Sequence, residues 1–161
     1  MTPTLSAKAR AFWLSFSIVW LLDFVTKRLA EHYLWTSPPV RVLGDFLRFS
    51  LGHNPHGAMG MSFGSASRIV FSVLAVVMLA LLWNFYRQSP QGDRVRAAAL
   101  GLVSGGALGN LVDRWRSPLG VVDFIDIGIG QLRFWTFNVA DTALTCGGIV
   151  LAVVLFKERP K

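Results

Sequence analysis

The sequence predicts an all-α membrane protein with four transmembrane helices and a small extracytoplasmic β-rich region. Of its 161 residues, 53% are hydrophobic and only 16% are charged, which is too apolar for an ordinary soluble domain of this size. The apolar residues are concentrated in four runs, each close to the roughly 20 residues that cross a bilayer. Most of the basic residues flank these runs.

The four runs predict helices over about 11–30, 69–85, 97–112 and 139–156. The first run follows Lys8 and Arg10 and could instead be a cleaved signal peptide. No small-residue cleavage site follows it, and the apolar stretch continues through DFVTKRLA, so we interpret it as a helix. With no internal repeat and no long linker, residues 1–161 are expected to form a single integral membrane domain.

Lysine and arginine predict the orientation of the helices. They crowd three short segments, at the start of the chain, between the second and third runs, and at the end, and such segments face the cytoplasm. The longer connections, about 31–68 and 113–138, then lie on the outer side, and both termini are cytoplasmic. The net charge of +7 is expected to meet anionic lipid headgroups rather than nucleic acid.

The two outer connections contain apolar extended segments. VRVLGDFLRFSLGHN and VVDFIDIGIGQLRFW mix β-branched and aromatic residues with a rough period of two, which indicates short strands or a small sheet on the membrane surface. The single cysteine, Cys146, lies inside the fourth run. It excludes an internal disulfide, and we expect a packed thiol.

Polar residues gather at the outer ends of the predicted helices and in the outer connections. Asp23 and Lys27 share one helix face, and Asn110, Asp113 and Arg114 share another. Gly101, Gly105 and Gly109 form a small-residue stripe that lets a neighbouring helix approach closely. The whole set is Asp23, Lys27, Asn54, Asn110, Asp113, Arg114, Asp123, Asn138 and Asp141.

Structural roles alone explain several of these residues. Asp23 and Lys27 can form an ion pair within one helix. Asn110, Asp113 and Arg114 can end the third helix and anchor it at the headgroups. Asn138 is placed as an N-cap, and Asp141, three residues later, completes a capping-box-like pair.

These roles leave Asp123 unexplained, because it is an acid in an apolar extended segment over the same bilayer surface. Two carboxylates that meet in a partly desolvated site share one proton and can act as acid and base toward water, as in aspartic peptidases. His53 and His56 have no third ligand near them, so we predict no metal site.

Five stretches in order resemble the lipoprotein signal peptidases, also called signal peptidase II. This is a family of aspartic peptidases in the bacterial inner membrane with four helices. The stretches are WLLDFVTK, HNPHGAMGMSFG, GGALGNLVDR, GVVDFIDI and FNVADTALTCG. One departure is that two residues separate Asn54 from Gly57.

The resemblance implies that Asp123 and Asp141 are the catalytic pair, with no metal or organic cofactor. It implies cleavage of diacylglyceryl-modified prolipoproteins on the N-terminal side of the lipidated cysteine, at the outer face of the membrane, by a protein in contact with phospholipid that we expect to be monomeric. The substrate-binding or site-lining residues would be Asp23, Lys27, Asn54, Gly57, Asn110, Asp113, Arg114 and Asn138.

Two other classes remain open from the residues themselves. A small transporter or proton channel would use intramembrane acids along a path, but here the acids gather at one end and no inverted repeat is visible. A non-enzymatic assembly protein would use the glycine stripe for association.

Overall fold

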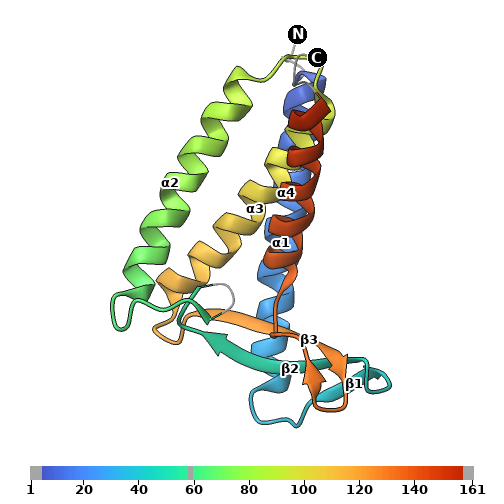
Figure 1. Cartoon of the computed structure of the whole chain (residues 1–161), viewed down its shortest axis with the longest axis vertical. Coiled ribbons are helices and arrows are strands. Elements are labelled where there is room, and N and C mark those ends of the chain that lie inside the picture. The colour runs from blue at the N-terminus through green and yellow to red at the C-terminus, as the bar shows by residue number, and fades with distance from the viewer. Residues whose placement is uncertain (1–4, 58–59, 158–161) are drawn as a thin grey trace.

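The computed structural model describes residues 5–57 and 60–157 and shows four helices with a small sheet at one end (Figure 1). Each helix is long and apolar enough to cross a membrane, which confirms the predicted fold class. The helices are α1 (Ala7–Leu34), α2 (Ser67–Gln88), α3 (Arg94–Arg116) and α4 (Val139–Lys157). The strands are β1 (Val40–Leu43), β2 (Leu47–Asn54), β3 (Val121–Ile129) and β4 (Leu132–Arg133).

Several helix ends extend beyond the apolar runs because polar residues cap them. The Ser6 side chain accepts a hydrogen bond from the backbone N–H of Ala9 at 3.2 Å. Asp93 does the same for Arg96 at 2.9 Å. Such caps satisfy backbone donors that the first turn leaves unpaired, so α1 and α3 begin several residues before their apolar runs.

Helix α3 is the centre of the bundle, and its small residues permit this. Of its apolar window 67% is buried, compared with 6% for α2. A Cβ placed on Gly105 would lie 2.7 Å from the carbonyl oxygen of Phe16 in α1. One placed on Gly106 would lie 2.6 Å from the carbonyl oxygen of Ala140 in α4. The glycine stripe therefore lets α1 approach α3 at backbone distance, as the small-residue spacing predicts, and Gly106, outside the stripe, does the same for α4.

The four strands form one antiparallel sheet in the order β1-β2-β3-β4. The sheet packs on the last turns of α1, where Ala30, Leu34 and Phe124 form a buried cluster. The chain then returns from β4 along β3. Phe137 pairs with Ile125 through N–H to O=C bonds of 2.8 and 3.0 Å, so the start of α4 lies beside β3.

Cys146 is exposed on α4, so the expected packed thiol is wrong. The buried residues of α4 are Ala140, Ala143 and Gly147, which follow the helical repeat of one face. Cys146 falls outside this stripe, because only the side of α4 that faces α3 is covered.

Candidate active site

Asn138 connects the two aspartates for which the sequence suggests a catalytic pair. Its side-chain amide donates to Asp123 Oδ1 at 2.7 Å, and its backbone N–H donates to Asp141 Oδ2 at 3.2 Å. Asn138 is fully buried and Asp123 is 5% exposed. The return of the chain along β3 thus brings two carboxylates from separate elements to one asparagine.

Asp141 lies in the first turn of α4, within the predicted capping box. The side-chain oxygen of Asn138 accepts the N–H of Asp141 at 2.9 Å, and Asp141 accepts the N–H of Asn138 in return. The other oxygen of Asp141, Oδ1, accepts from Asn110 Nδ2 at 2.9 Å. These donors and the positive end of the helix dipole stabilise negative charge on this carboxylate.

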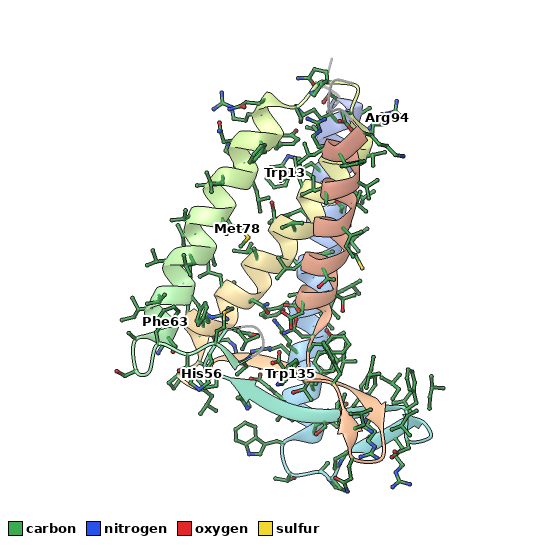
Figure 2. All side chains as sticks on the ribbon, in the orientation of Figure 1. Trp13, His56, Phe63, Met78, Arg94 and Trp135 are labelled. Carbon is green, nitrogen blue, oxygen red and sulfur yellow. The ribbon has the colours of Figure 1, made fainter. Side chains whose placement is uncertain are left out.

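Both aspartates line a cavity of about 700 Å³ at the junction of the helices and the sheet. Its apolar wall comes from α2, α3 and α4, and Figure 2 shows Met78 between α2 and α3, with His56 and Trp135 at the level of the sheet. A few convergent polar groups in an otherwise apolar cavity are typical of a ligand site. The predicted residues that line it are Asn54, Gly57, Asn110, Arg114, Asp123 and Asp141.

The environment of Asp123 favours its protonated form. Burial and the negative charge of Asp141 raise the pKa of Asp123 to about 7, against the hydrogen bond from Asn138, which lowers it. A buried carboxyl beside a second carboxylate is difficult to ionise. At neutral pH the two groups can therefore hold one proton between them.

Asn54 shapes its own loop as well as the cavity. Its Oδ1 accepts the backbone N–H of His56 at 2.9 Å, and its Nδ2 donates to the carbonyl of Gly57 at 3.4 Å. Asn54 also lowers the pKa of Asp123, against the larger effects of burial and Asp141. The two residues between Asn54 and Gly57 are thus accommodated by a side-chain turn, and both residues still line the cavity.

Arg114 joins α3 to this loop. Its Nη2 donates to the carbonyl of His56 at 3.1 Å, and its Nη1 donates to the carbonyl of Asn110 at 3.2 Å. The guanidinium lies over the ring of Phe71, 5.5 Å from the centroid. It supplies a fixed positive charge to the wall that holds the aspartates.

Four of the residues that the sequence predicted to line the site do not line the cavity, because their side chains lie behind its wall. Asp23, Lys27 and Asp113 are each at most 2% exposed and face the α1–α3 contact. Asp113 and Arg114 are consecutive, and successive helical residues point about 100° apart, so one turns inward and the other toward the cavity. The fourth, Asn138, sits between the carboxylates.

The structure identifies two contributors that the sequence did not single out. Arg28 Nη2 lies 2.8 Å from Asp113 Oδ1, and the ring of Phe71 packs where a Cβ on Gly57 would lie. The neighbouring basic residues Lys27 and Arg28 were the sequence signal that could have identified Arg28. Phe71 is one of many aromatic residues in an apolar run, so the sequence offered no signal for it.

His53 and His56 do not form a ligand pair with a third side chain. His53 Nε2 lies 3.8 Å from Glu31 Oε1. Across residues 5–57 and 60–157, three or more His, Cys, Asp or Glu side chains are nowhere grouped to hold a metal ion. Asp126 on β3 forms an ion pair with Arg133 on β4 at 2.7 Å, which braces the β3–β4 hairpin.

Comparisons with known proteins agree with these features. The model of a family described as signal peptidase (SPase) II matches residues 15–157. A lipoprotein signal peptidase of Streptomyces griseus is 37% identical over 145 residues, covering 87% of this chain and 70% of the relative. One from Coxiella burnetii is 39% identical over 146 residues, covering 88% and 87%.

A solved structure of a bacterial membrane enzyme has the same fold. It superposes with a TM-score of 0.81 at 31% identity, covering 90% of this chain and 87% of the other. A second such structure gives a TM-score of 0.79 at the same identity.

Proposed function

Because the chain belongs to the signal peptidase II family, we propose that Asp123 and Asp141 are the pair with which it removes signal peptides from prolipoproteins. The observation that carries the assignment is that both carboxylates line one cavity and both bind Asn138. A carboxyl pair that shares a proton can activate water without a covalent intermediate.

The two aspartates have different roles in this proposal. Asp141 is the ionised member, since three groups favour its charge: Asn110 Nδ2, the Asn138 N–H and the helix N-terminus. Asp123 is the protonated member, because burial and the neighbouring carboxylate raise its pKa to about 7. Asn138 holds Asp123 Oδ1, which leaves the other oxygen of Asp123 to carry the proton.

Hydrolysis then follows with balanced protons. Asp141 removes a proton from water as the water oxygen attacks the scissile carbonyl carbon, and Asp123 donates its proton to the carbonyl oxygen. When the C–N bond breaks, Asp141 gives its proton to the leaving nitrogen and Asp123 recovers one from the diol. The products are a carboxylic acid and an amine, and both aspartates return to their starting states.

The shape of the cavity fits a substrate that lies partly in lipid. The apolar side chains of Phe71, Leu74 and Met78 on α2 face Leu144 on α4 across it. This wall continues into the membrane-spanning helices, so it can accept the apolar helix of a signal peptide and a diacylglyceryl chain. We place the scissile bond before the lipidated cysteine, because that bond joins these two apolar parts.

The orientation is also a proposal, supported by charge. The first turn of α1 and the last turn of α4 lie at one end of the bundle and the sheet lies at the other (Figure 1). Lys8, Arg87, Arg94 and Lys157 lie at the end away from the sheet, and the positive-inside rule assigns that end to the cytoplasm. The aspartate pair then opens to the outer face of a bacterial inner membrane.

We propose further that one copy is sufficient. The two aspartates and the donors that hold them, Asn110 and Asn138, come from a single chain. A monomer therefore contains the complete pair.

The assignment is tested by Asp123→Asn and Asp141→Asn in proteoliposomes that contain a lipidated precursor peptide. Loss of either acid–base group should lower turnover at least 10²–10⁴-fold, with each variant still folded by size-exclusion chromatography. Asp93→Asn is the matched control, because asparagine can keep the cap at the far end of α3. Near-normal cleavage by either active-site variant would refute the assignment, and a transporter or assembly protein would yield no cut product at all.

A further inference from the structure

The ammonium group of Lys27 is enclosed between α1 and α3 and contacts three acceptor oxygens there. The residue is 1% exposed. Its Nζ lies 2.8 Å from Asp23 Oδ2 and 3.0 Å from Asp113 Oδ2. It also donates to Asn110 Oδ1 at 2.8 Å. One of these contacts is a hydrogen bond and two are ion pairs, so the buried charge of the ammonium is balanced by two carboxylates.

Two of these acceptors hold the backbone that precedes the catalytic aspartates. Asp23 Oδ1 accepts the N–H of Ala140, the residue before Asp141, at 2.9 Å. Asp113 Oδ2 accepts the N–H of Val122, the residue before Asp123, at 3.2 Å. The segments that carry the two aspartates are therefore both attached to carboxylates that Lys27 joins.

The third acceptor touches the site through its own side chain. Asn110 Nδ2 donates to Asp141 Oδ1 at 2.9 Å. An ammonium offers donors only, so the amide oxygen of Asn110 must face Lys27. The NH₂ group of the amide is then turned toward Asp141. Asn138 Nδ2, which donates to the same oxygen at 3.3 Å, and the acceptor-only Asp141 carboxylate favour this orientation too, so Lys27 holds the Asn110 side chain in place rather than choosing between two orientations.

We propose that Lys27 is the positioning residue of the aspartate pair: its ammonium, through three acceptors, fixes the backbone before Asp123 and Asp141 and the place of the Asn110 side chain. The inference rests on the catalytic role proposed above for the two aspartates. Lys27 lies outside the cavity lining and acts only through these groups.

The charge of Lys27 supplies a second effect, which a merely structural residue would lack. Burial and Asp141 raise the pKa of Asp123, and the Lys27 ammonium opposes them. Removal of the ammonium should raise that pKa further. The charged groups around Lys27 are Asp23 on its own helix, Asp113 and its partner Arg28, Asp123 on β3, and Asp141 through Asn110.

The first test is Lys27→Met, which keeps the length of the side chain and removes its charge. We expect kcat per folded molecule to fall roughly 100-fold, since displacements of about 1 Å in a catalytic group have effects of this size. KM should change little, and the alkaline limb of the kcat profile should move to higher pH. The matched control is Lys8→Met, a 2% exposed lysine on the same helix that donates to the carbonyl of Ser89 at the far end.

A double variant covers the case in which Lys27→Met does not fold. Asp23→Asn with Lys27→Met removes both charges of one pair, leaves Asp113 with Arg28 at 2.8 Å, and keeps an acceptor for the Ala140 N–H. Removing both partners of a buried pair is tolerated better than removing one. The double variant should fold and still lose kcat, because Asn110 and Asp113 no longer have the ammonium that holds them.

The outcomes separate this inference from the proposed function. If Asp123→Asn and Asp141→Asn are inactive but the Lys27 variants keep normal kcat and an unmoved alkaline limb, the positioning role is wrong and the catalytic pair stands. If Asp123→Asn retains activity, the proposed function itself fails. A loss of folded protein in the single variant, with normal kcat in the double variant, also overturns the positioning role.

Discussion

Replacing Asn138 by alanine removes a side chain that contacts both aspartates. Its carboxamide donates to Asp123 Oδ1 at 2.7 Å and accepts the Asp141 N–H at 2.9 Å. The lost N-cap is worth about 1 kcal/mol of stability, and a hydrogen bond to the neutral carboxyl of Asp123 about 0.5–1.5 kcal/mol. We expect Asn138→Ala to lower the free energy of unfolding by about 1.5–2.5 kcal/mol in total.

Asn138→Ser separates the two losses. Serine is a good N-cap, but its hydroxyl is too short to span from the helix start to Asp123. The serine variant should therefore keep about 1 kcal/mol of the stability that alanine loses. Both variants should lose activity alike, by roughly 10–100-fold in kcat, because neither orients Asp123.

The assay is peptide cleavage in proteoliposomes, together with unfolding of the same preparations in detergent. Because the Asn138 hydrogen bond lowers the pKa of Asp123, both variants should also move the alkaline limb of activity to higher pH. Full activity in the serine variant would show that the contact with Asp123 has no catalytic consequence. Equal stability of the two variants would show that the cap is not the origin of the alanine effect.

Two further predictions concern pH and packing. kcat/KM should fall about tenfold per pH unit well above pH 7, since Asp123 must keep its proton and its pKa is about 7; a flat profile between pH 7 and 9 would contradict this. Gly109→Ala should cost about 1–3 kcal/mol of stability, because its Cβ would lie against the Asp23 carboxylate. Gly148→Ala, with open space at its Cβ, is the control, and equal effects of the two alanines would contradict the packing explanation.

Local patterns in the sequence predicted much of the fold. The helices follow from apolar runs of membrane-spanning length, and the close approach of a neighbouring helix to α3 follows from the spacing of Gly101, Gly105 and Gly109. The capping box of Asn138 and Asp141 was predictable because it involves residues three apart at a helix start.

The parts that the sequence did not predict depend on contacts between distant segments. The ion pair of Asp23 and Lys27 was visible from its spacing, but the partner Asp113 on α3 was not, because the glycine spacing does not specify which helix packs against that face of α3. For the same reason the sequence placed Asp113 at the cavity, although its side chain is buried against Val122. The exposure of Cys146 likewise depends on which side of α4 is covered.

The most direct test is the titration of the Asp123 carboxyl carbon by NMR, in the unsubstituted protein and in Asp141→Asn. We expect Asp123 to titrate near pH 7, since burial and the Asp141 charge raise its pKa to about 7. In Asp141→Asn the titration should move clearly to lower pH, because the neighbouring negative charge is gone. An Asp123 carboxyl that titrates at the same pH in both proteins would contradict the coupling of the two groups on which the proposed hydrolysis depends.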